Sequence, residues 1–189
     1  MKKIAITGSI ASGKSTVAKL LKSKTSPIFD ADLVVKNLYK KKIFLKSLSR
    51  ILKHRIRSKQ DIRKLLRSKK IKLKQLEKFI HPKVRRERKN FIRKNINKKM
   101  CFFEIPLLFE SKLQKNYHKC VFVFAPLKKR KKLFIQRGGN IKHFNLFDKR
   151  QIQPQRKIQK SDYVIYNDKS LKNLKEKVKI LKLKLLKYA

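Results

Sequence analysis

The chain has 189 residues, 41% of them hydrophobic, which is enough for one domain with a sizeable core. Lysine and arginine total 56 against 11 acidic residues, giving a formal net charge of +45. The apolar content excludes a disordered polycation. No apolar run approaches the length that a transmembrane helix needs, and the first residues show no signal-peptide pattern, so we expect a soluble, cytoplasmic protein with no membrane partner.

The positive charge raises nucleic acid as a partner, and a nucleic-acid-binding protein is therefore one candidate class. The lysines occur in nearly every segment instead of gathering in one tail or arm. Abundant Lys, Ile, Phe and Asn beside scarce Gly would also follow from an AT-biased genome. We therefore expect no specific nucleic-acid partner. Cys101 and Cys120 each lie inside an apolar run and are predicted to be buried core residues.

Five short apolar runs have the length and the β-branched or aromatic content of buried strands. Segments with helical spacing lie between them, and this alternation predicts an α/β fold with a parallel sheet. The predicted strands are 3–7, 26–30, 99–105, 119–125 and 162–167.

The segment GSIASGKST directly follows the first strand and satisfies the phosphate-loop pattern. Its glycines allow a tight turn whose N–H groups point at phosphate oxygens, and the helix predicted at about 14–23 adds positive potential. Lys14 is expected to bridge the β- and γ-phosphates of ATP, and Ser15 to bind Mg²⁺. A plain glycine turn between strand and helix is the alternative. The predicted ATP-binding residues here are Gly8, Ala11, Ser12, Gly13, Lys14, Ser15 and Thr16.

Two long polar stretches interrupt the alternation of strands and helices. Residues 33–98 contain only helical patterns, which predicts a helical insert covering one side of the site. Residues 127–160 form a second, strongly basic helical excursion suited to a closing lid. The segment 169–188 is predicted to be an amphipathic helix packed on the sheet. We predict one domain over 1–189 with a P-loop NTPase fold: a five-stranded parallel sheet flanked by helices, a helical substrate-binding insert and a basic helical lid.

A phosphate loop by itself does not distinguish a GTPase, an ATPase motor and a small-molecule kinase. The short chain, the absence of a guanine-binding Asn-Lys-x-Asp signature, the insert and the basic lid all favour a kinase. A lid rich in Arg and Lys can neutralise charge on the transferred phosphoryl group while excluding water. A kinase for a nucleoside monophosphate or for another small molecule stays open at this point.

Four further motifs resemble the dephospho-CoA kinase family, in the right order along almost the whole chain. They are FDADLV at the second strand, LEKFIHPKVR at 76–85, EIPLLFE at 104–110 and SDYVIYND at 161–168. The resemblance implies transfer of the ATP γ-phosphate to the ribose 3′-hydroxyl of 3′-dephospho-CoA. The products are CoA and ADP, and the reaction is the last step of coenzyme A synthesis.

The resemblance also implies the catalytic residues. Asp32, just beyond the end of the second strand, would orient the 3′-hydroxyl and accept its proton. Capping a helix N-terminus is the alternative for Asp32, and Asp30 is expected to shape the turn. Lys14 and the lid residue Arg137 would complete the catalytic set by contacting the ATP phosphates.

Other positions match the family's acceptor side, lid and last strand. His81 and Arg85 lie where a cation could meet substrate phosphates, and a structural role is the alternative for His81, because a lone histidine in an apolar helix is more often structural. Leu107 and Leu108 would line the acceptor cleft, and core packing is the alternative for both. Gln151 and Lys157 align with later positions of the lid. A solvated face is the alternative for Lys157. The predicted substrate-binding residues are Asp32, His81, Arg85, Pro106, Leu107 and Leu108. Asn167 is expected to border the adenine site.

The loop departs from the family's glycine-rich pattern at Ser9 and Ala11, which replace two glycines. Phosphate binding should survive if neither residue needs a positive φ. Glu104 follows an apolar strand, where many P-loop proteins carry a metal-organising acid, but the sequence leaves it without a role. The expected partners are ATP with Mg²⁺ and 3′-dephospho-CoA, and the expected assembly is a monomer or a small homo-oligomer.

Overall fold

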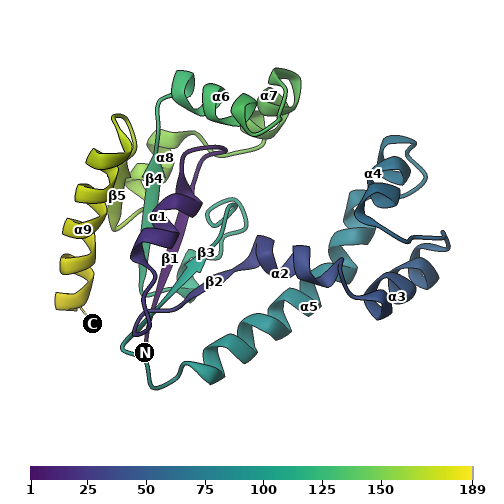
Figure 1. Cartoon of the computed structure of the whole chain (residues 1–189), viewed down its shortest axis with the longest axis horizontal. Coiled ribbons are helices and arrows are strands. Elements are labelled where there is room, and N and C mark those ends of the chain that lie inside the picture. Colours follow the sequence, from purple (N-terminus) through teal and green to yellow (C-terminus); the bar gives the residue numbers. More distant parts are fainter. Residues whose placement is uncertain (189) are drawn as a thin grey trace. The chain divides into compact units, whose positions relative to one another are not determined.

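A computed structural model describes residues 1–188. Its centre is a five-stranded sheet with the order β2-β3-β1-β4-β5, which confirms the predicted parallel α/β architecture (Figure 1). β1 pairs in parallel with β3 and β4, and β4 pairs in parallel with β5. The strands span Lys2–Gly8 (β1), Ile28–Asp30 (β2), Met100–Glu104 (β3), Lys119–Phe124 (β4) and Tyr163–Tyr166 (β5), within a residue or two of the predicted runs.

The central strands are buried on both faces, as their continuous apolar runs predict. Every residue of β3 is buried, and so are the last five residues of β1. Cys101 and Cys120 lie in this interior, as predicted. Burial raises the pKa of the Cys120 thiol to about 11, so this cysteine is held as the neutral thiol.

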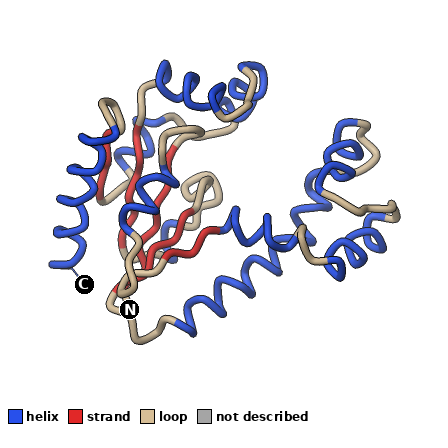
Figure 2. The backbone as a smooth tube through the Cα atoms, viewed as in Figure 1, coloured by secondary structure: helices blue, strands red, loops and turns tan. Residues whose placement is uncertain are grey.

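Two helices cover one face of the sheet. α1 (Lys14–Leu21) and the last helix, α9 (Leu171–Tyr188), share a core with side chains of β1, β3, β4 and β5 (Figures 1 and 2). Four residues of α9, spaced three or four apart, form its buried stripe, which confirms the predicted amphipathic helix. They are Leu174, Val178, Leu181 and Leu185.

The opposite face is covered by the chain after β3 and by the end of the basic excursion. Ala5 of β1 packs there with Leu108, Phe109 and Cys120, and Ile152 packs against the same cluster. The excursion contains α6 (Leu127–Gln136), α7 (Ile141–Lys149) and α8 (Pro154–Gln159). A short 3-10 helix, η1, lies between β3 and β4 and spans Gln114–Asn116.

The residues from Asp30 to Lys94 form a compact unit of their own, and the rest of the described chain forms the other unit. This helical unit contains α2 (Ala31–Leu38), α3 (Lys42–Leu52), α4 (Lys59–Arg67) and α5 (Leu73–Lys94). Its own hydrophobic cluster includes Leu48, which is fully buried. The sequence predicts helices throughout this stretch, and the structure confirms them. The predicted roles of 33–98 as a substrate insert and of 127–160 as a lid stay predictions.

The buried stripe of α9 gives a test of the packing on the sheet. Leu185→Ala removes a fully buried side chain and is expected to lower the free energy of unfolding by about 2–5 kcal/mol, because a cavity remains. The neighbouring Leu186 is 46% exposed, so Leu186→Ala is the matched control and should change stability little. Urea denaturation followed by circular dichroism measures both. Equal losses in the two variants would contradict the packing described here.

Candidate functional site

The phosphate loop joins the end of β1 to the start of α1, and two of its positions require glycine. A Cβ on Gly8 would collide with the Ser12 hydroxyl and come within 2.8 Å of the Val123 carbonyl oxygen. Gly13 has a φ of 90°, and a Cβ there would collide with the Asn167 side chain. The structure therefore explains both glycines of the motif by close backbone approach and left-handed geometry.

Gly13 is also the N-cap residue of α1, so the loop leads directly into a helix N-terminus. Its carbonyl oxygen accepts hydrogen bonds from Thr16 and Val17 at 2.9 and 3.1 Å, which closes the first turn of the helix. The first N–H groups of an α-helix have no partner within the helix and carry the positive end of its dipole. The loop thus has the geometry of an anion site.

Ala11 stands where the family pattern has glycine, and phosphate binding was expected to tolerate this alanine if the position needs no positive φ. The structure does not meet that condition. The φ of Ala11 is 57°, in the left-handed region that glycine adopts without strain, whereas Ser9 has no positive φ. A left-handed conformation costs a residue with a Cβ about 1–2 kcal/mol. The loop therefore holds Ala11 in a strained backbone conformation that surrounding contacts must maintain.

Glu104, which has no assigned role in the sequence analysis, brings the two signature side chains of the loop together. Its Oε1 atom accepts hydrogen bonds from Lys14 Nζ at 2.8 Å and from Ser15 Oγ at 2.6 Å. The Glu104 side chain is 5% exposed and that of Lys14 is 13% exposed. Glu104 ends β3, and Ile6 of β1 is its register partner, so the parallel sheet places this acid beside the loop. An acid at the end of a buried strand is the sequence signal for it.

Asn167 supports the loop on another side. It is buried just after β5, and its Nδ2 donates to the Ser12 carbonyl oxygen at 2.9 Å. Its Oδ1 accepts from Lys129 Nζ at 2.9 Å, and the same ammonium group donates to the Lys169 carbonyl oxygen at 2.6 Å. The contact with Ser12 makes Asn167 part of the loop's support, whereas its predicted place beside the adenine stays a prediction. Nothing in the sequence singles out Lys129 among the neighbouring lysines.

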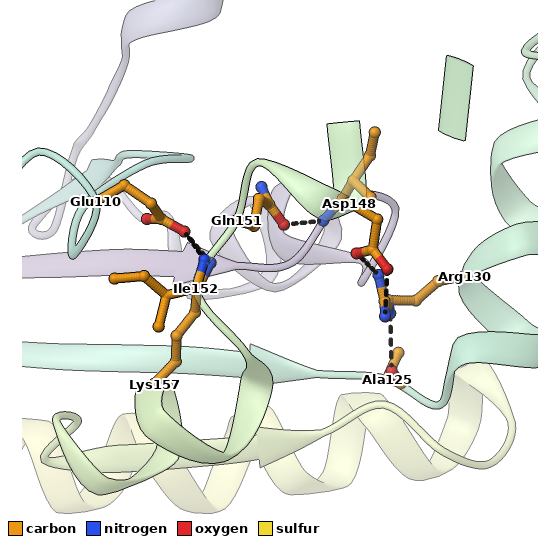
Figure 3. Close-up of polar contacts among 8 residues, drawn as sticks. Glu110, Ala125, Arg130, Asp148, Gln151, Ile152 and Lys157 are labelled. Atoms are coloured by element: carbon orange, nitrogen blue, oxygen red, sulfur yellow. Dashed lines mark hydrogen bonds and ion pairs between the residues drawn. The ribbon is translucent and has the colours of Figure 1, made fainter. Parts of the chain in front are cut away.

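The solvated-face alternative for Lys157 is wrong. Its side chain is fully buried, and Nζ lies 2.6 Å from Glu110 Oε1 in an ion pair (Figure 3). Arg130 is the other buried cation of the excursion, and its Nη1 lies 2.6 Å from Asp148 Oδ1. Burial of a cation is favourable only with such a partner, and the motif ending in Glu110 supplies one of them.

The remaining predicted residues of the sheet-containing unit are placed as follows. Arg137 is exposed at the end of α6, where its predicted contact with ATP stays a prediction. Pro106 is half-buried, and its carbonyl oxygen accepts from Thr7 Oγ1 at 3.3 Å. Leu107 is 45% exposed, whereas Leu108 is fully buried in the core, so core packing accounts for Leu108.

The predicted acceptor residues Asp32, His81 and Arg85 belong to the helical unit, and all three are exposed. The cap of α2 is Asp30, whose Oδ1 accepts from Leu33 N at 2.9 Å. Asp32 lies in the first turn of α2, so the capping alternative for Asp32 is wrong. His81 and Arg85 lie on α5, one turn apart.

The family model described as dephospho-CoA kinase matches residues 2–173. A dephospho-CoA kinase of Bartonella quintana is 34% identical over 185 residues, covering 94% of this chain and 95% of the relative. The chain belongs to the dephospho-CoA kinase family. It is an ATP-dependent phosphotransferase of that family.

Solved structures agree with this membership. A crystal structure from Thermus thermophilus has a TM-score of 0.79 and 30% identity, with 97% of each chain covered. The dephospho-CoA kinase from Campylobacter jejuni has a TM-score of 0.68 and 27% identity, with 98% of each chain covered. In the part of this kinase that the structure describes, no helix is long and apolar enough to cross a membrane.

The buried ion pair of this family member gives a second test. Glu110→Gln leaves Lys157 charged and without a carboxylate, so it is expected to lower the free energy of unfolding by about 3–5 kcal/mol. Glu110→Gln combined with Lys157→Met removes both charges and should recover most of that loss. Thermal and urea denaturation measure both variants.

The pair of Lys177 and Asp168 is the matched control, because both of its side chains are about one-third exposed. Asp168→Asn should therefore change stability little. A Glu110→Gln variant as stable as the wild type, or a double variant less stable than the single one, would contradict the assignment of a buried, mutually dependent pair.

Proposed function

We propose that this chain is a magnesium-dependent dephospho-CoA kinase that transfers the ATP γ-phosphoryl group to the ribose 3′-hydroxyl of 3′-dephospho-CoA. The reaction yields CoA and ADP and completes coenzyme A synthesis. The observation that carries the proposal is the phosphate loop, in which Lys14 and Ser15 meet on Glu104, within a chain that matches the family over residues 2–173.

The donor half of the proposed site is the loop itself. Backbone N–H groups of residues 11–16 and the N-terminus of α1 would hold the phosphate oxygens, with Gly8 and Gly13 allowing the required close approach. Lys14 would exchange its contact with Glu104 for the β- and γ-phosphates and neutralise charge on the transferred group. Arg137 would add a second cation from the lid.

The residues present fit a magnesium ion. Mg²⁺ prefers oxygen ligands and takes one or two protein groups together with substrate phosphates. Ser15 Oγ and Glu104 Oε1 are 2.6 Å apart at the loop and supply such oxygens. Bound there with ATP, the ion would neutralise charge on the β- and γ-phosphates. We propose Ser15 as a direct ligand and Glu104 as the acid that holds the ligand set in place.

The acceptor half would come from Asp32 and from residues of the helical unit. Asp32 would orient the ribose 3′-hydroxyl and accept its proton as the O3′–P bond forms and the bond from phosphorus to the ADP oxygen breaks. ADP then leaves with the electron pair of the broken bond. We propose His81 and Arg85 for the substrate phosphates, and Pro106 and Leu107 for the wall of the cleft. A cytoplasmic location, a monomer or small homo-oligomer and the lack of a specific nucleic-acid partner stay predictions.

The choice of acceptor can be tested directly. The purified protein with Mg²⁺ and ATP should release ADP rapidly when 3′-dephospho-CoA is added, and chromatography should detect CoA as the product. AMP, CMP and shikimate are acceptors for comparison and should leave the rate at its background. Stimulation by a nucleoside monophosphate without stimulation by dephospho-CoA would replace this proposal with a different small-molecule kinase.

Asp32→Asn tests the proposed base. The change should lower kcat by at least ~10², the usual range for loss of a positioned general base. Asp30→Asn is the matched control, because asparagine also caps helices well and so preserves the start of α2. Steady-state assays at saturating substrates measure both. Near-wild-type turnover by Asp32→Asn would remove Asp32 from the mechanism.

A further inference from the structure

The chain that joins α7 to α8 is held at both ends by ion pairs whose cations are buried. We call residues 148–157 the return segment, because it leads from the basic excursion back to the sheet (Figure 3). Asp148 starts the segment and Lys157 ends it. The side chains that pair with them come from distant parts of the sequence, Arg130 in α6 and Glu110 after β3.

The first pair fixes the start of the return segment. Arg130 is 4% exposed, and its guanidinium contacts both carboxylate oxygens of Asp148, with Nη1–Oδ1 at 2.6 Å and Nη2–Oδ2 at 3.4 Å. Its Nε also donates to the Ala125 carbonyl oxygen at 3.2 Å. A planar guanidinium with contacts on two sides has little freedom to move, so Asp148 is tied to the end of β4.

The second pair fixes the other end. Glu110 Oε1 lies 2.6 Å from Lys157 Nζ and also accepts from the backbone N–H of Ile152 at 3.0 Å. The Ile152 side chain packs against the cluster that contains Leu108 and Phe109. Glu110 therefore anchors the segment at a side chain and at the backbone.

Gln151 lies between these anchors and contacts the phosphate loop. Its backbone N–H donates to the Asp148 carbonyl oxygen at 3.0 Å. Its side-chain Oε1 accepts from the backbone N–H of Ile10 at 2.9 Å, across 141 positions of sequence. Ile10 directly precedes Ala11, the loop residue with a φ of 57°.

The loop is thus held on both sides of its strained residue. Gln151 binds the N–H of Ile10 before Ala11, and Asn167 binds the carbonyl of Ser12 after it. A strained backbone conformation persists where neighbouring contacts determine it. A loop fixed before its ligand arrives loses less conformational entropy on binding, so the ligand binds more tightly.

We propose that Gln151 is a positioning residue of the phosphate loop, and that the pairs Arg130–Asp148 and Lys157–Glu110 hold Gln151 against Ile10. Gln151 acts on the affinity for the nucleotide through the conformation of residues 10–12. The inference rests on the proposed function in one respect, that the ligand of the loop is ATP.

Gln151→Met tests it, because methionine keeps the length of the side chain and removes the acceptor. The expected result is a Kd for Mg·ATP and Mg·ADP raised about 5–10-fold by calorimetry, the size expected for one lost hydrogen bond. The KM for ATP should rise in parallel, while kcat at saturating ATP and the KM for 3′-dephospho-CoA change less than about twofold. Gln155→Met, at an exposed position of α8, is the matched control and should bind both nucleotides like the wild type.

Amide hydrogen exchange supplies a measurement that can also be made on the wild type and on Gln151→Glu, so the test does not depend on Gln151→Met alone. The Ile10 N–H should be protected in the wild type and in Gln151→Glu, which keeps an acceptor oxygen, and should exchange faster in Gln151→Met. Rapid exchange of this amide in the wild type overturns the inference.

The binding data separate the two proposals. A wild type that binds Mg·ATP together with a Gln151→Met variant that binds it equally well overturns the role of Gln151 alone. A higher Kd with a parallel fall in kcat also overturns it, because that pattern belongs to a residue of the chemical step. A wild type that binds neither nucleotide overturns the proposed function, and this inference with it.

Discussion

The scarcity of negative charge is the constraint to which the rest of this structure responds. With 56 cationic side chains and 11 acidic ones, repulsion among like charges opposes compaction, and a cation withdrawn from water needs one of few available carboxylates. Three cations that are nearly or fully buried each have such a partner: Lys14 with Glu104, Arg130 with Asp148, and Lys157 with Glu110. All three pairs lie around the phosphate loop and the segment that returns to it. The charges of exposed lysines elsewhere are hydrated by water and screened by salt ions.

This distribution explains how a lysine-rich kinase keeps one lysine distinct from the others. Lys14, like Lys157, is mostly withdrawn from water beside a carboxylate, but Lys14 lies in the phosphate loop, where Glu104 directs its ammonium group. The same carboxylate oxygen accepts from Ser15, so a single acid orients both signature side chains. These two side chains of the phosphate loop are therefore arranged by contacts inside the protein, whereas a large net charge by itself fixes no such geometry.

The sequence predicted what depends on local pattern. Runs of apolar residues predict the five buried strands, the helix after the phosphate loop and the amphipathic stripe of α9. The spacing of apolar residues along such a run indicates which face of the element is buried. Partners across the sequence were not predictable in this way. Glu104 meets Lys14 only because β3 pairs with β1, and Gln151 meets Ile10 only because the excursion returns past the loop. The left-handed backbone of Ala11 and the burial of Lys157 were also missed, because composition gives no sign of either.

The separate hydrophobic cores of the two compact units bear on how this protein family can diversify. The helical unit begins at Asp30 and ends at Lys94, and its apolar residues pack with one another. Changes on its surface can accumulate without repacking the sheet that carries the phosphate loop. Under the proposed assignment of the acceptor to the helical unit, evolution can exchange the acceptor of a phosphoryl-transfer enzyme while the loop proposed to hold the donor stays intact.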